Sequence, residues 1–134
     1  MGYRLYYSGN QGTSANPAPP KGYFWKMIYC VAWITLGSAS GTRTIAILRK
    51  PQAGMTYSYY LVPLLSSTLA VSGDTLASVG STGNSGFTSS VAASESAVWQ
   101  ENVIFMSDSA LYMAWGLQTG DVSGYEFLVE ELPV

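Results

Sequence analysis

Residue types able to perform catalysis are scarce in this sequence. The 134-residue chain contains no histidine and one cysteine, so Ser-His-Asp catalysis and imidazole metal ligands are both excluded. Two carboxylates suffice for glycoside hydrolysis, and the acids to consider are Glu126, Glu130 and Glu131. In an extended strand the last two point to opposite faces, whereas Glu126 and Glu130 share a face that reads as solvated. We therefore expect no catalytic residues and no enzymatic activity.

The sequence gives equally little indication of a metal site or a phosphate site. Asp74, Asp108 and Asp121 each stand in a turn segment, where aspartate either binds calcium or accepts hydrogen bonds from nearby backbone amides. The second role is favoured because each stands alone. The glycine-rich segment 80–86 contains no lysine and precedes no helical pattern, unlike a phosphate loop. The sequence thus predicts no metal and no other cofactor, and it predicts that Cys30 is a small buried apolar residue.

The overall composition restricts the possible partners. Charged residues make up only 10% of the chain, and eight acids against six bases leave a net charge of −2, which does not favour binding to nucleic acid. No uncharged apolar run reaches the length of a membrane span, and the N-terminal residues lack the pattern of an export signal. No acceptor motif for N-glycosylation occurs either. We expect a protein made in a cytosol, without nucleic-acid or membrane partners, whose weakly charged surface is partly covered by other protein.

Alternating apolar residues predict a chain of short strands. The densest run, at 23–49, predicts a β-hairpin that reverses at the small residues 37–41. Further strands are expected at 55–65, 98–106, 110–117 and 125–132, and segment 66–80 suits one or two short strands or a short helix. Segment 80–96 is expected to be a long surface loop or a poorly bounded strand. About seven or eight strands without helical periodicity indicate an all-β fold, an antiparallel β-sandwich of jelly-roll type, with an immunoglobulin-like sandwich as the alternative.

The first 22 residues differ from the rest and suggest an extended N-terminal arm. Aromatic and apolar residues stand near its tip, and prolines then favour an extended, semi-rigid bridge. Two domains follow from this interpretation: an arm and proline-rich bridge at 1–22, and a sandwich at 23–134. The expected interface residues are those of the tip and the bridge: Tyr3, Leu5, Tyr6, Tyr7, Pro17, Pro19 and Pro20. An edge strand of the same domain and a frayed tail remain alternatives for residues 1–16.

Short motifs stand out in two parts of the chain. The first part has a proline-glycine lead-in, a tryptophan segment and a Gly-x-Arg turn, at 19–22, 25–27 and 41–47. The second part has the segments 110–112 and 117–121 and a terminal Val-Glu-Glu segment at 127–132. Together they resemble small structural proteins encoded among the virion genes of tailed bacteriophages. The likeness covers roughly residues 19–132 and leaves the first residues outside it.

The resemblance implies a β-sandwich built into a phage particle. The preferred role is a capsid decoration or cement protein that binds the major capsid protein lattice as a homo-oligomer, a trimer by preference, on the virion surface. A protein of the tail, neck or host-adsorption apparatus is the alternative within the same class. A carbohydrate-binding module is a further alternative, in which exposed tyrosines stack on sugar rings and turn aspartates hold hydroxyl groups or calcium. Most of the four tryptophans and ten tyrosines are expected in the core, because a sandwich needs large residues to fill its layer and all the tryptophans, Trp25, Trp33, Trp99 and Trp115, lie in expected strands.

Overall fold

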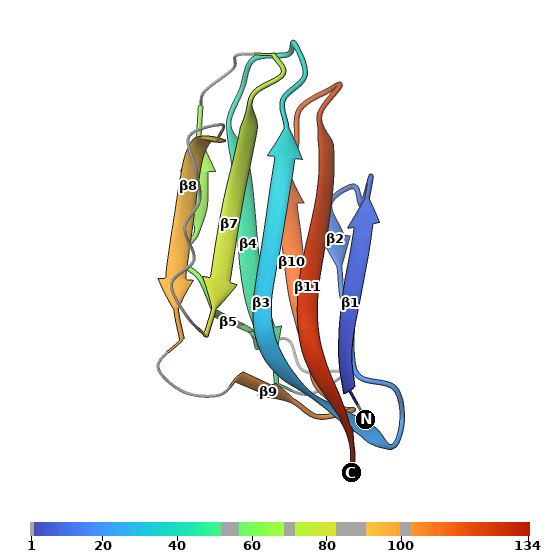
Figure 1. Ribbon diagram of the computed structural model, residues 1–134. Helices are drawn as coiled ribbons and strands as arrows, with labels where there is room; N and C mark the ends of the chain where they lie inside the picture. The colour runs from blue at the N-terminus through green and yellow to red at the C-terminus, as the bar shows by residue number, and fades with distance from the viewer. Residues whose placement is uncertain (1, 52–56, 69–71, 83–90, 100–102) are drawn as a thin grey trace.

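The computed structural model of the chain describes residues 2–51, 57–68, 72–82, 91–99 and 103–134, and every regular element within them is a β-strand (Figure 1). The first sheet has the order β1 (Gly2–Gly9), β11 (Val122–Pro133), β3 (Tyr23–Thr35), β7 (Thr75–Ser81) and β8 (Val91–Val98), and β9 (Val103–Phe105) also pairs with β3. The second has the order β2 (Ser14–Ala15), β10 (Ala110–Gly116), β4 (Arg43–Lys50) and β5 (Tyr59–Tyr60), and β6 (Leu65–Ser67) also pairs with β4. All pairings are antiparallel except that of β7 with β8.

The two sheets enclose one apolar core, as expected for a β-sandwich. Strands β10 and β11 alternate buried and partly exposed residues along most of their length, which is the pattern of a strand with one face in the core. Residues from both sheets form a single buried cluster that includes Trp25, Ile45, Leu111, Trp115 and Phe127. Cys30 is fully buried within this cluster, as predicted, and burial raises the pKa of its thiol.

The predicted hairpin at 23–49 is wrong in its pairing although both strands exist. Strand β3 pairs with β11, β7 and β9, whereas β4 pairs with β10, β5 and β6 in the opposite sheet. The segment between them therefore crosses from one sheet to the other. Both strands carry continuous apolar faces, and these faces meet across the core rather than lying side by side.

The number and limits of the strands also differ from the expectation. Eleven strands are present among the described residues, because the segment expected as one strand at 55–65 contains β5 and the start of β6. Segment 66–80 forms the end of β6 and most of β7, and no helix occurs in its described part. A loop throughout 80–96 is wrong at both ends, where the strand alternative is correct, since β7 extends to Ser81 and β8 begins at Val91. Residues 83–90 lie outside the described part.

The extended arm is not what the structure shows. Residues Gly2 to Gly9 form β1 and pair along their whole length with β11 of the same chain, and residues Ser14 and Ala15 pair with β10. The edge-strand alternative is therefore the correct one for residues 2–9. Tyr6 is the residue of this segment that packs against the core, while the backbone pairing with β11 holds the rest of the strand.

A buried ion pair joins two loops at one end of the sandwich. The side chains of Arg43 and Asp121 are fully buried, and Arg43 Nε lies 2.8 Å from Asp121 Oδ2. The carboxylate also accepts hydrogen bonds from the backbone amides of Gly37 and Gln118, at 2.8 and 2.9 Å. Arg43 donates further hydrogen bonds to the carbonyl oxygens of Ala39 and Gly41. Asp121 thus has the predicted bonds to backbone amides, and in addition an arginine partner that the sequence did not reveal.

Replacement of Asp121 by asparagine should destabilise the fold. The substitution leaves the Arg43 guanidinium buried without its counter-ion, which typically costs about 3 kcal/mol or more. Urea unfolding followed by tryptophan fluorescence measures this loss. Asp74→Asn is the matched control, because no hydrogen bond or ion pair involves the Asp74 side chain in the described part of the chain. Equal stability of the two variants would contradict a structural role for the pair.

The stabilisation by Asp121 should depend on pH in one direction. Hydrogen bonding to Arg43 lowers the pKa of Asp121 to about 2, below the value of about 3.9 in an unfolded chain. The contribution is therefore complete above about pH 4 and is lost as the pH falls towards 2. The difference in unfolding free energy between the wild type and Asp121→Asn should shrink over this interval. A difference that stays constant down to pH 2 would be inconsistent with the lowered pKa.

Candidate protein-interaction surface

Strand β1 divides its side chains between the core and the surface. Tyr6 points inward, and its ring centroid lies 5.2 Å from that of Trp25 and 4.9 Å from that of Phe127. Tyr3, Leu5 and Tyr7 point outward and are 68%, 58% and 69% exposed. Three of the four predicted tip residues are thus available to a partner, whereas the prediction is wrong for Tyr6.

A buried carboxylate anchors β1 from the inside. Glu131 Oε2 accepts hydrogen bonds of 2.9 Å from both Tyr6 Oη and Trp25 Nε1, and Arg4 Nε lies 3.4 Å from Oε1. The hydrogen bond from Trp25 is the main reason that the pKa of Glu131 is lowered, and burial is the main reason that the pKa of Tyr6 is raised. Glu131 and Glu130 lie on opposite faces of β11, as the sequence predicted, and Glu131 serves the fold.

The outward side chains of β1 continue onto the neighbouring strands. In the sheet register Leu5 lies beside Leu128, which lies beside Tyr29, and Tyr7 lies beside Glu126, which lies beside Val31. Paired residues share a face of the sheet, so an apolar surface extends across three strands. We call the residues Tyr3, Leu5, Tyr7, Tyr29 and Trp33 the tyrosine face.

The Trp33 side chain passes over Gly124 of β11 and contacts Tyr7 of β1. Gly124 separates Trp33 from Gly9 in the register, and a Cβ at Gly124 would lie 2.7 Å from the Trp33 ring. The absence of that atom lets the indole lie flat over β11 and stack on Tyr7, with ring centroids 5.8 Å apart. The aromatic surface is therefore preassembled from two strands that are not direct neighbours.

The polar groups near the tyrosine face are few. Tyr29 Oη donates a 2.9 Å hydrogen bond to Glu126 Oε2, and burial followed by this bond raises the pKa of Tyr29. Glu126 and Glu130 share the outward face, as predicted, but on the central strand β11 rather than at an edge. The face is thus apolar at its centre and carries charge beside it, the usual anatomy of a protein interface.

The expectation that the tryptophans are core residues is wrong for Trp33, because β3 contains a bulge. Residues Val129 and Leu128 of β11 face Met27 and Tyr29, so Ile28 is an extra residue on β3. Such a bulge shifts the alternation by one position. Trp25 and Met27 therefore point inward, whereas Tyr29 and Trp33 point outward. No feature of the β3 sequence alone marks this position.

The three prolines of the expected bridge lie against the sandwich. The carbonyl oxygen of Pro17 accepts a hydrogen bond of 2.9 Å from the amide of Leu111, and that of Pro20 accepts one of 3.0 Å from Tyr23. Pro19 is buried. These residues connect β2 to β3 within the domain, and the structure does not place them on the tyrosine face.

Within the described residues, no group of three or more side chains is arranged to hold a metal ion. The same residues include no helix that is long and apolar enough to cross a membrane. Comparison of the chain with protein-family models, curated proteins and solved structures finds no significant match.

Truncation of Tyr6 should lower the stability of the fold much more than truncation of Tyr3. Tyr6→Ala removes a ring from the core and a donor from Glu131, so we expect a loss of about 3 kcal/mol in unfolding free energy. Tyr3→Ala removes a solvent-exposed ring and should change stability by less than about 0.5 kcal/mol. Chemical denaturation of both variants measures the contrast. Similar small effects at both positions would contradict the assignment of β1 to the sandwich.

Proposed function

We propose that this chain is a non-catalytic structural subunit of a tailed-phage virion, most simply a capsid decoration protein, and that it binds a neighbouring subunit through the tyrosine face. The observation that carries the proposal is the exposed apolar row Tyr3, Leu5 and Tyr7 on a long edge strand. Assignment to a virion rests on the resemblance of segments 19–132 to virion proteins of tailed phages.

The four sheet edges support a partner at β1. Strands β2 and β5, at the edges of the second sheet, have two residues each, and very short edge strands limit unwanted pairing. Strand β8, at the other edge of the first sheet, carries Ser94, Glu95 and Ser96. Strand β1 has eight residues with an exposed apolar row and a single charge. An edge of this kind invites aggregation unless a specific partner covers it.

The strand order supports a jelly-roll topology. In the first sheet β1, β11, β3 and β7 are successive neighbours, and in the second sheet β2, β10, β4 and β5 follow in parallel sequence. Strands at the same place in the two sheets follow one another among these eight strands of the chain: β1 and β2, β10 and β11, β3 and β4, and β5 and β7. This is the arrangement of a long hairpin wrapped into two sheets, and it is common in viral capsid proteins and lectins. The strand order therefore favours a jelly roll over the immunoglobulin-like alternative, and a jelly roll suits a virion or binding role.

Two contacts fit the tyrosine face: another copy of this chain, in a trimer or other symmetric oligomer, or the major capsid protein. Sedimentation of the isolated chain separates these cases, because only the first gives an oligomer without other proteins. Copy number per particle then separates the capsid surface from the tail or neck. A decoration protein is present in roughly the same number as the capsid lattice sites, whereas a tail or neck protein is present in far fewer copies.

The triple variant Tyr3→Ser, Leu5→Ser, Tyr7→Ser should fold and fail to assemble. Exposed aromatic residues at the centre of an interface carry much of its binding free energy, so we expect binding to the particle or to other copies to weaken by at least about tenfold. Sedimentation and co-purification with particles measure it. A matched control is Tyr57→Ser, Tyr59→Ser, Tyr60→Ser, which changes exposed tyrosines at the edge of the second sheet.

Three results would overturn the proposal. The chain is not a virion protein if purified particles lack it. The tyrosine face is not the contact if the triple variant assembles like the wild type. The contact lies on the second sheet if only the control variant loses assembly.

A further inference from the structure

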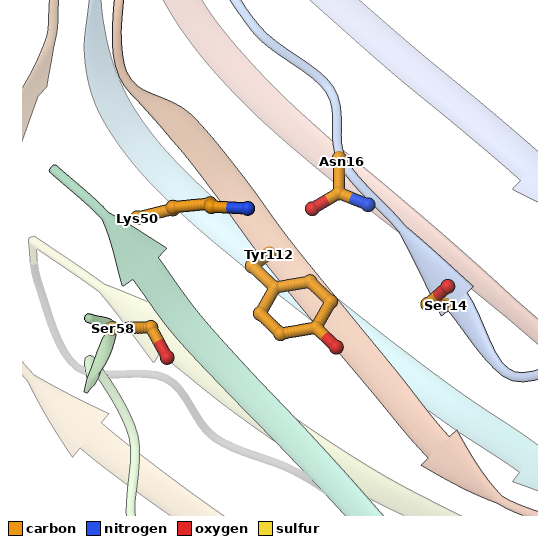
Figure 2. A pocket seen from close by; sticks show the side chains of 5 residues that line it. All are labelled: Ser14, Asn16, Lys50, Ser58 and Tyr112. Atoms are coloured by element: carbon orange, nitrogen blue, oxygen red, sulfur yellow. The ribbon is translucent and has the colours of Figure 1, made fainter. Parts of the chain in front are cut away.

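A polar groove crosses the outer face of the second sheet, on the side of the sandwich opposite the tyrosine face. One hollow of about 320 Å³ is lined by Ser14, Asn16, Lys50, Ser58 and Tyr112 (Figure 2). A second hollow of about 300 Å³ shares two of these residues, Asn16 and Lys50, with the first and extends past Asp108. Both volumes are near the lower limit for small-ligand sites, and the shared walls make them two subsites of one groove.

The floor of the first hollow is aromatic and its rim is polar. Tyr112 stands between Leu111 and Met113, which are buried in the core, so its side chain lies on the outer face. Figure 2 shows the ring lying between Lys50 and Ser58 on one side and Asn16 and Ser14 on the other, with its broad face towards the viewer. Flat aromatic rings bind the C–H face of sugar rings, and the surrounding side chains are suited to the hydroxyl groups.

Several polar side chains of the groove are not used by the fold. Among the described residues, the side chains of Asn16, Lys50, Asp108 and Tyr112 take part in no hydrogen bond or ion pair. Among the described residues, Lys50 is the one charged residue that lines the first hollow. An ammonium group in this position favours a carboxylate, because charge-assisted hydrogen bonds are stronger than neutral ones. In the second hollow Asp108 would repel an anion and accept hydrogen bonds from hydroxyl groups.

We propose that this groove binds an acidic oligosaccharide, with a uronic acid stacked on Tyr112 and its carboxylate paired with Lys50, and with a neutral sugar beside Asp108. The site is separate from the tyrosine face, so it is compatible with assembly and does not depend on it. The net charge of the chain is −2. A preference for an anionic sugar would therefore have to come from Lys50 locally and not from general attraction.

The test compares two disaccharides that differ only in the acidic group: a glucuronate-glucose disaccharide and cellobiose. Nuclear magnetic resonance titration of the full chain at low salt should show saturable binding of the acidic sugar, with shifts at Ser14, Asn16 and Tyr112. We expect a preference of about tenfold over cellobiose, equivalent to about 1.4 kcal/mol. Added salt should reduce this preference.

Four variants connect the preference to named side chains. Lys50→Gln should remove the preference for the acid, whereas Lys21→Gln, which makes the same charge change away from the groove, should keep it. Tyr112→Ala should weaken binding of both sugars, and Tyr112→Phe should retain most of it. The proposal is overturned if neither sugar binds at about 10 mM, if both bind equally, or if the two lysine variants behave alike.

Discussion

The register of β1 on β11 is the constraint on which the surface of this protein depends. Tyr6 enters the core between Trp25 and Phe127 and donates its hydroxyl to the buried carboxylate of Glu131. Because strand side chains alternate, a slip of one residue would expose Tyr6 and drive Tyr3, Leu5 and Tyr7 inward. The buried tyrosine thereby decides which tyrosines are available to a partner.

The buried ion pair of Arg43 and Asp121 fixes the segment that connects the two sheets. Strands β3 and β4 belong to different sheets, so the segment between them must cross the edge of the core. Arg43 and Asp121 hold that crossing against the loop between β10 and β11, and every bond they make is to a backbone group or to each other. A buried pair of this kind is often no more stabilising than well-packed apolar residues, but removal of one partner leaves an uncompensated buried charge. Here it closes the same end of both sheets.

The sequence was sufficient for the class of fold and insufficient for its pairing. Alternation in segments such as 110–117 and 125–132 correctly predicted strands, since period-two patterns reflect burial on one face. It could not tell a hairpin from a crossing between sheets, because 23–35 and 43–50 carry apolar residues in either case. It also could not locate the extra residue Ile28, which moves Tyr29 and Trp33 to the surface. Tyr3, Leu5 and Tyr7 are exposed, on a strand and not on an arm, and their role in an interface stays a prediction.

The two outer faces of the sandwich differ in chemistry. The first sheet presents the exposed aromatic and apolar side chains of the tyrosine face on β1 and β3, with Glu126 and Glu130 between them on β11, which suits another protein. The second presents a groove with an aromatic floor and unused polar groups, which suits a soluble or surface-bound saccharide. A subunit attached by one face and open on the other is a consistent arrangement for a particle surface.

Hydroxyl-radical footprinting of the free chain and of the assembled particle tests the central claim most directly. In the free chain Tyr3, Leu5 and Tyr7 should be labelled readily while Tyr6 is protected. In the assembly those three should become protected, and Tyr60 on the second sheet should stay labelled. Labelling of Tyr6 as fast as Tyr3 in the free chain would show that β1 is not part of the sandwich. Continued labelling of Tyr3 and Tyr7 in the particle would show that the tyrosine face is not the contact.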